Sequence, residues 1–272
     1  MTIASPVRRR SSIGIGNTRL PLGPAYAVMI VLLYLPIVLL AVFSITANTS
    51  LSFPLKSFTL AWYGDALADS SILDAARNSL VVGTAAATAA TALAFAISLA
   101  VLRFRFVGRQ LLLGLSAAPL VVPFVVLGVA LFLGFNLLGI PRSLLTVAAG
   151  HSVVALPYAA LILLARMVGL DPALEDAAMD LGATYPTTLR RVILPLLGPS
   201  LVSAWLTAFV VSFDEVALAN FLAGGDATFP VYLYGELRFA QRLPVLIAMA
   251  VMLMVATMAL TLLANRLRSR NA

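Results

Sequence analysis

Long apolar runs alternate with short polar segments along the chain. Six runs have the roughly 20 residues that a helix needs to cross the hydrocarbon core of a bilayer. They cover residues 24–45, 78–102, 110–133, 143–167, 198–222 and 244–264. This pattern predicts an all-α membrane protein with six transmembrane helices between residues 24 and 264, preceded by a tail of residues 1–23 and followed by a tail of residues 265–272.

The composition supports a membrane setting. Hydrophobic residues make up 61% of the 272 residues and charged residues only 11%, whereas about a quarter of the residues in a soluble domain are charged. The chain contains no cysteine, which excludes disulfides, iron–sulfur clusters, thiolate zinc sites and cysteine nucleophiles.

The first apolar run follows three consecutive arginines, Arg8, Arg9 and Arg10, as the apolar core of a signal peptide does. It is longer than such a core, however, and no A-x-A cleavage pattern follows it. We therefore expect an uncleaved first transmembrane helix.

The distribution of basic residues predicts the orientation. With six spans, one side of the membrane receives Arg8, Arg9, Arg10, Arg19, Arg103, Arg105, Arg109, Arg166, Arg190, Arg191, Arg266, Arg268 and Arg270, and the other receives Lys56, Arg77, Arg142, Arg238 and Arg242. The positive-inside rule places the richer side, with both termini and the loop 168–197, in the cytoplasm, and the loop 46–77 outside. The net charge of +7 is thus explained by contact with anionic lipid rather than nucleic acid.

Small residues and prolines distinguish individual runs. Within the second run, small side chains recur at four-residue spacing and predict close contact with neighbouring helices, at Gly83, Ala86, Ala87, Ala90 and Ala94. The third and fourth runs contain Pro119, Pro123 and Pro157. Each proline removes a backbone hydrogen bond and favours a kink.

The loop 168–197 is too long for a simple turn and rich in helix-forming residues. Asp171 is expected to cap a helix that starts at Pro172, and Gly182 is expected to end it. One face of this helix is apolar, with Leu174, Ala177, Ala178 and Leu181, while the acids Glu175, Asp176 and Asp180 lie largely on other faces. A second amphipathic segment, 187–193, leads to Pro195 and the fifth run.

These residues also carry a resemblance to a known family. The sequence Asp176-Ala177-Ala178, followed by Gly182 and then by Ile193-Leu194-Pro195, resembles the EAA loop of type I ABC importer permeases, with Asp176 where the family usually has glutamate. The resemblance implies the MetI-like permease fold in a bacterial inner membrane. It also implies a loop that couples to a separate ATPase through Glu175, Asp176, Ala177, Ala178, Gly182, Ile193 and Pro195.

The same resemblance implies the partners, which are two ATPase subunits, a second homologous permease subunit and a periplasmic binding protein. The chain has a single lysine, Lys56, in the outward loop, so it cannot form the G-x-x-x-x-G-K-[ST] phosphate-binding loop. We therefore expect a transport subunit that is not an enzyme and binds no cofactor, with ATP and magnesium bound by the partner. In the alternative role, the loop is an amphipathic helix lying on lipid. Its four acids outnumber its two arginines, and this excess of negative charge opposes adsorption to an anionic membrane surface.

Two acids fall deep in an apolar run. Asp214 and Glu215 lie about 16 residues beyond Gly198, which corresponds to roughly 24 Å along a helix. Carboxylates inside a membrane are costly and point to function, so we expect one of the two to face the pathway and bind a cationic substrate. His151 is the alternative partner for them within the chain, and it is a candidate either for direct contact with the substrate in the pathway or for a hydrogen bond between helices. Trp205 and Phe213 are candidates for cation–π contact or for apolar packing.

A second resemblance narrows the substrate. The segments Ser212-Phe213-Asp214-Glu215, Asn220-Phe221 and Gly224-Gly225, together with Thr59-Leu-Ala-Trp62-Tyr63, Arg77-Asn78-Ser79-Leu80, His151 and Leu156-Pro157, resemble spermidine/putrescine permeases, specifically the second of their two permease subunits. This implies polyamine transport, with other amines, opines and aminophosphonates as alternatives.

Two other classes of protein fit less well. A secondary transporter or channel would show an inverted repeat or further ionisable residues in the spans. A membrane enzyme would need a nucleophile, a base or a metal cluster, and one histidine with two adjacent acids forms none of these.

Overall fold

The computed structural model describes the backbone of residues 22–269 and the side chains of residues 23–259. Residues 1–21 and 270–272 of the two predicted tails lie outside this range. The elements, in chain order, are α1 (Leu22–Ser44), α2 (Ala61–Ala68), α3 (Ser70–Arg103), α4 (Arg109–Ala117), η1 (Ala118–Leu120), α5 (Phe124–Leu137), α6 (Leu144–Val168), α7 (Ala173–Asp180), α8 (Tyr185–Thr188), the π-helical η2 (Leu189–Ile193), α9 (Leu194–Phe213), α10 (Ala219–Leu222), α11 (Phe229–Glu236), η3 (Ala240–Arg242) and α12 (Leu243–Ser269).

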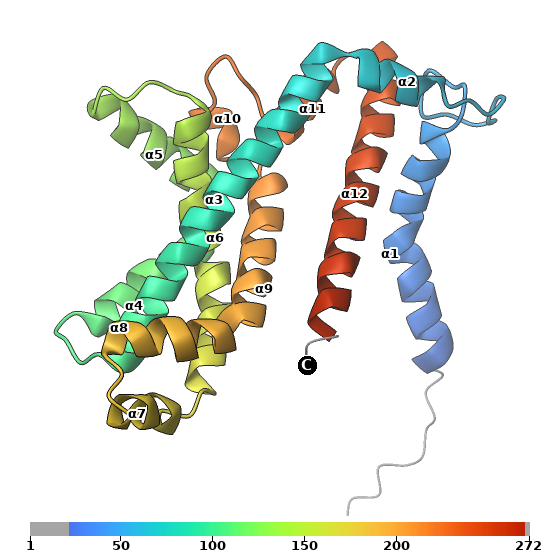
Figure 1. Ribbon diagram of the computed structural model, residues 1–272. Helices are drawn as coiled ribbons and strands as arrows, with labels where there is room; N and C mark the ends of the chain where they lie inside the picture. Colours follow the sequence, from blue (N-terminus) through green and yellow to red (C-terminus); the bar gives the residue numbers. More distant parts are fainter. Residues whose placement is uncertain (1–21, 270–272) are drawn as a thin grey trace, which may run out of the picture.

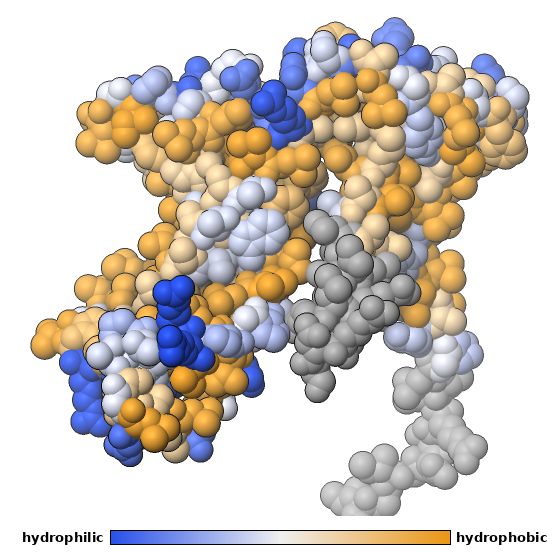
Figure 2. Space-filling view, in the orientation of Figure 1, coloured by the Kyte–Doolittle hydropathy of each residue, from blue (hydrophilic) through white to orange (hydrophobic). Residues whose placement is uncertain are grey.

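Three helices, α3, α6 and α9, pack against one another and form the centre of the molecule, while α1 and α12 run side by side along one edge (Figure 1). The short helices α2 and α11 connect this edge to the centre at the upper end of the view, and α7 and α8 lie at the opposite end. Hydrophobic residues cover most of the visible surface between the two ends (Figure 2). This distribution fits a bundle whose sides face lipid.

Close packing of α3 follows from its small residues, as predicted. Ala86, Ala90 and Ala94 have no exposed surface. At Gly83, an added Cβ would lie 3.0 Å from the ring of Phe209 on α9. The absence of larger side chains therefore lets α6 and α9 approach the backbone of α3.

The third apolar run does not form the single helix that the sequence predicted. It is split into α4 with η1 and α5, two arms that meet at an angle of 112°. Pro119 lies in η1 and Pro123 directly precedes α5, so the two missing amide donors fall at the break. Pro157, in contrast, lies within a continuous α6.

The predicted boundaries of the fifth span were also wrong. The helix begins at Tyr185, because α8, η2 and α9 follow one another without interruption, and it ends at Phe213 rather than at residue 222. Within the described residues, five helices are long and apolar enough to cross a membrane, or six if the bent pair counts as one span. The predicted number of spans therefore holds with the third one broken.

Candidate functional site

The loop at the lower end of Figure 1 contains the predicted helix, α7. The helix begins at Ala173, one residue later than predicted, and its N-cap is Pro172 rather than Asp171. Oδ1 of Asp171 still accepts a hydrogen bond from the backbone N–H of Ala173 at 2.9 Å. Gly182 ends it in a left-handed conformation with φ of 88°, which glycine adopts at little cost.

The apolar face of α7 points away from the bundle. Leu174 is 47% exposed and Leu181 is 91% exposed, and Ala177 between them is exposed as well. Asp176 also lies at the surface. A helix that presents aliphatic side chains outward in this way has a surface suited to insertion into a groove of another protein.

Glu175 lies on the opposite face of α7 and is only 7% exposed. Its Oε1 is 2.6 Å from Nη2 of Arg103, the last residue of α3, and Nε of Arg103 donates to the same oxygen at 2.6 Å. Both side chains are largely buried. The ion pair therefore attaches α7 to the end of α3, a contact that sequence reasoning did not predict.

The three remaining predicted loop residues differ in exposure, and Ala178 is partly buried. Ile193 is 1% exposed and packs with Met167, Leu170 and Leu197, so it fixes the base of the loop rather than lying on its surface. Pro195 is exposed in the first turn of α9.

Asp214 and Glu215 do not lie within a transmembrane helix, in contrast to the prediction. Asp214 is the C-cap of α9 and Glu215 follows it. At this end of α9 the chain turns before forming α10. The two side chains nevertheless have different environments, since Asp214 is exposed and Glu215 is buried.

Glu215 is 5% exposed and held by the protein itself. Its carboxylate accepts hydrogen bonds from the backbone N–H groups of Leu218 at 2.8 Å and Ala219 at 2.9 Å. Its Oε2 lies 3.4 Å from Nε2 of His151 on α6. His151 is completely buried, and its Nδ1 is 2.8 Å from Oγ of Ser212. His151 thus connects α6 to Ser212 at the end of α9, which agrees with the predicted role as a hydrogen-bond partner between helices.

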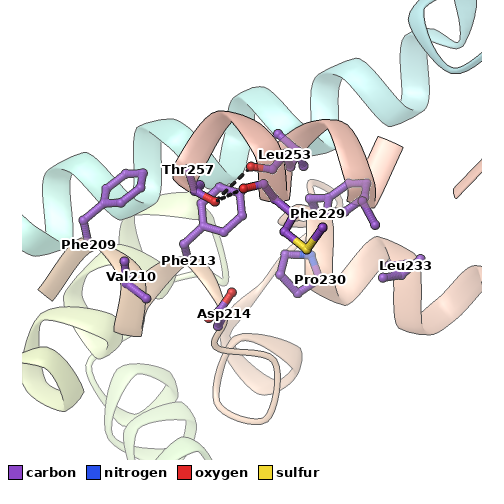
Figure 3. A pocket seen from close by; sticks show the side chains of 11 residues that line it. Phe209, Val210, Phe213, Asp214, Phe229, Pro230, Leu233, Leu253 and Thr257 are labelled. Atoms are coloured by element: carbon purple, nitrogen blue, oxygen red, sulfur yellow. Dashed lines mark hydrogen bonds between the residues drawn. The ribbon is translucent and has the colours of Figure 1, made fainter. Parts of the chain in front are cut away.

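Asp214, in contrast, is exposed to a cavity of about 370 Å³. Figure 3 shows its carboxylate at the edge of a group of aromatic and aliphatic side chains from α9, α11 and α12. Phe213 and Phe229 contribute rings to the wall. Asp214 is the only ionisable side chain among the eleven that line this cavity, all of them described.

The predicted aromatic residues form a row along α9. Trp205 stacks on Phe209 with ring centroids 5.4 Å apart, and Phe209 lies 5.7 Å from Phe213. The indole N–H of Trp205 donates to Oγ1 of Thr88 on α3 at 3.0 Å. Of the two predicted aromatic residues, Phe213 lines the Asp214 cavity. Trp205 lies two turns away along α9 and is bonded to α3.

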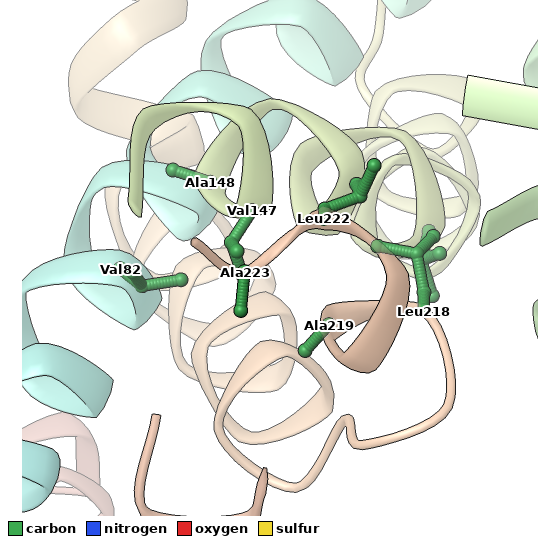
Figure 4. Packing of buried hydrophobic residues seen from close by; sticks show 8 residues of the cluster. Val82, Val147, Ala148, Leu218, Ala219, Leu222 and Ala223 are labelled. Carbon is green, nitrogen blue, oxygen red and sulfur yellow. The ribbon is translucent and has the colours of Figure 1, made fainter. Parts of the chain in front are cut away.

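The segment after Glu215, which contains α10, packs against α5 and α6. Its buried side chains, Leu218, Ala219, Leu222 and Ala223, pack against Val82, Val147, Ala148 and Val154 (Figure 4). An added Cβ at Gly150 would lie 2.5 Å from Leu222, and one at Gly128 would lie 3.0 Å from the Cα of Leu218. These glycines admit the segment, and sequence reasoning did not single them out because a glycine in an apolar run gives no sign of what lies opposite it.

Comparison with known proteins agrees with this architecture. The model of the family described as "Binding-protein-dependent transport system inner membrane component" matches residues 92–272. The chain therefore belongs to this family of ABC importer permease subunits and is a multi-pass protein of the inner membrane.

Particular relatives can be named as well. The chain is 31% identical over 241 residues to the spermidine/putrescine transport system permease protein PotC of Haemophilus influenzae, covering 88% of this chain and 93% of the relative. It is 33% identical over 214 residues to the putrescine transport system permease protein PotI of Escherichia coli K12, covering 76% of each.

Solved structures share the fold at low sequence identity. A chain of a bacterial ABC transporter that imports alginate superimposes with a TM-score of 0.72 at 15% identity, covering 92% of this chain and 93% of that one. A chain of the MetNI methionine ABC transporter in an inward-facing conformation gives 0.60 at 15% identity, covering 72% and 93%. The expected type I importer permease fold is thereby confirmed.

Proposed function

We propose that this permease subunit conducts a polyamine such as spermidine or putrescine, and that Asp214 binds one of its ammonium groups. The observation that carries the proposal is the carboxylate of Asp214, the one ionisable group among the described side chains that line a largely apolar cavity of about 370 Å³. Of the two relatives named above, one is a spermidine/putrescine permease and the other is a putrescine permease, which supports the same substrate class here.

The chemistry of the cavity fits such a substrate. A polyamine consists of ammonium groups separated by methylene chains. A carboxylate attracts the charged end, and the faces of aromatic rings such as Phe213 and Phe229 attract cations within about 6 Å while also accepting methylene groups. Glu215 is unsuited to this role, because its carboxylate is buried and already accepts two backbone hydrogen bonds.

We further propose that α7 docks on a separate ATPase through its exposed apolar face, formed by Leu174, Ala177 and Leu181. The complete importer would then contain two ATPase subunits, a second homologous permease subunit and a periplasmic binding protein. ATP and magnesium would be bound by the ATPase. In this arrangement both termini of the chain lie in the cytoplasm, and the Asp214 cavity lies toward the outer side of the membrane.

The test is uptake of radiolabelled spermidine by the complete importer in proteoliposomes. Asp214→Asn keeps the size of the side chain and removes its charge, so we expect uptake to fall by at least about tenfold, which is the loss of roughly 1.4 kcal/mol of binding free energy. Asp226→Asn is the matched control, because Asp226 is exposed nearby and does not line the cavity.

Unchanged spermidine uptake by the Asp214→Asn variant would contradict the role of the cavity. Competition by an opine or an aminophosphonate, with no competition by putrescine, would replace the polyamine by that substrate. Uptake that proceeds without any ATPase would favour a secondary transporter or channel.

A further inference from the structure

Helix α3 is in contact with both functional regions of the chain. At its lower end, consecutive residues hold the two helices that flank Gly182. Arg103 pairs with Glu175 of α7 at 2.6 Å, and Phe104 packs edge to face on Tyr185 of α8 with ring centroids 5.8 Å apart. Because Gly182 lies between α7 and α8, the end of α3 contacts the loop on both sides of its turn.

At its upper end, α3 is bonded to the segment that forms one wall of the Asp214 cavity. Oγ of Ser79 accepts a hydrogen bond from the backbone N–H of Phe229 at 2.8 Å, and Nδ2 of Asn78 donates to the carbonyl of Ala227 at 3.1 Å. Phe229 lines the cavity. From Ser79 to Arg103 the helix rises about 36 Å at 1.5 Å per residue.

Between these two points α3 is a single uninterrupted helix. Its Ala86, Ala90 and Ala94 are completely buried against neighbouring helices, so the helix has no room to bend locally. Because densely packed segments deform little and transmit strain, we expect a displacement at Arg103 to be carried along the axis of α3.

The second connection between the loop and the cavity is α9, which continues from α8 through η2. It carries Phe213 and Asp214 on its own wall of the cavity. The two walls thus have different attachments, since α9 is continuous with α8, whereas the Phe229 wall is bonded to α3 and α3 is paired with α7.

We propose that α3 is the mechanical link between the coupling helix α7 and the Phe229 wall of the cavity, with Arg103–Glu175 as its cytoplasmic attachment and Ser79–Phe229 as its outer one. This inference rests on the proposed function, because it assumes that α7 is moved by an ATPase and that the cavity holds the substrate. Arg103, Glu175 and Ser79 are positioning residues, which act on the substrate only through other groups.

The test measures substrate imported per ATP hydrolysed by the complete importer in proteoliposomes. Arg103→Gln and Glu175→Gln each break the pair, and we expect them to lower this ratio by about five- to tenfold, within the usual range of coupling between distant sites. The charge-swapped double variant, Arg103→Glu with Glu175→Arg, should restore at least about half of the wild-type ratio, because the attraction between the two positions is retained. Arg105→Gln, at an exposed arginine two residues further on, is the control and should leave the ratio unchanged.

Ser79→Ala tests the outer attachment, with Thr84→Ala on the exposed face of α3 as its control. If both attachments belong to one link, the combined Arg103→Gln and Ser79→Ala variant should be no worse than Arg103→Gln alone, which is a non-additive result.

Three results would overturn the inference. The first is a wild-type ratio of substrate imported to ATP hydrolysed in both single variants, at Arg103 and at Glu175. The second is a charge-swapped double variant whose ratio does not recover. The third is loss of the ATPase from the purified complex of the single variants, since the pair would then serve assembly only. Failure of the proposed function is distinguishable from all three, because the wild-type importer itself would then not take up polyamine.

Discussion

At the scale of single residues, the contrast between Asp214 and Glu215 shows how backbone position decides the use of a carboxylate. The two acids differ in side-chain length by one methylene group and are adjacent in the chain. Glu215 turns inward and accepts from the N–H groups of Leu218 and Ala219, donors that are otherwise unpaired where a new helical turn begins. Asp214 remains at the cavity.

Removal of the Glu215 carboxylate should destabilise the protein. Glu215→Ala leaves the backbone N–H groups of Leu218 and Ala219 without an acceptor and removes the carboxylate beside the buried His151, and the loss of one member of such a buried polar group costs on the order of 3 kcal/mol. We expect the midpoint of thermal unfolding in detergent to fall by several degrees. Asp214→Asn, at an exposed position, is the control and should unfold at the wild-type temperature. An unchanged midpoint for Glu215→Ala would show that this carboxylate does not hold the segment after α9.

At the scale of elements, the packing of α3 depends on which of its faces carries the small residues. Ala89 and Ala90 are neighbours, but Ala90 is completely buried and Ala89 is exposed. The buried face also carries Gly83, beside the ring of Phe209. Close approach of α6 and α9 therefore requires small side chains on this face only.

Enlarging the buried face should separate the central helices. Ala90→Leu inserts three carbon atoms into a filled interface, and overpacking of this kind costs about 1–3 kcal/mol. We expect less folded protein in the membrane and a lower midpoint of unfolding. Ala89→Leu adds the same atoms on the exposed face and should behave like the wild type. Equal effects of the two substitutions would contradict the packing described for α3.

At the scale of the whole molecule, the arrangement of charges and apolar surface defines an orientation across the membrane. Hydrophobic residues dominate the sides of the visible face and hydrophilic residues gather toward its ends (Figure 2). The positive-inside rule predicts that α7 lies in the cytoplasm and that the loop after α1 lies outside. We therefore expect the end of the bundle that carries α7 and the end that carries the loop after α1 to face opposite sides of the membrane.

The orientation can be measured with single cysteines, because the natural chain has none. A cysteine replacing Ser50, which is exposed in the loop after α1, should react in intact spheroplasts with a maleimide that does not cross membranes. A cysteine replacing Leu181, which is 91% exposed beside α7, should react only after the cells are opened. The cysteine-free parent is the background control, and labelling in the reverse order would show that the topology is inverted.

The long, uninterrupted apolar runs were predictable, because spanning a bilayer constrains length and composition within the segment itself. The runs that became α1, α3 and α6 needed no knowledge of their neighbours. The third and fifth runs were predicted less well. Hydropathy does not distinguish a straight helix from two arms at 112°, and it does not register that α9 ends at Phe213 while the apolar sequence continues to Leu222.

For the candidate site, the sequence predicted the short helix that ends at Gly182, whereas the role of the acids at positions 214 and 215 stays a prediction. It did not predict the pairing of Glu175 with Arg103, residues separated by 72 positions, or the separate environments of Asp214 and Glu215. Nothing local to either acid indicates which of the two will meet His151.

The sequence by itself thus determined the membrane setting, the number of apolar runs, the short helix between the fourth and fifth runs and the family, because each follows from local composition or from short motifs. The tertiary structure alone decided which carboxylate faces the cavity, what holds α7 and what α3 connects. Those outcomes depend on contacts between distant segments, whose geometry is settled only when all the helices pack together.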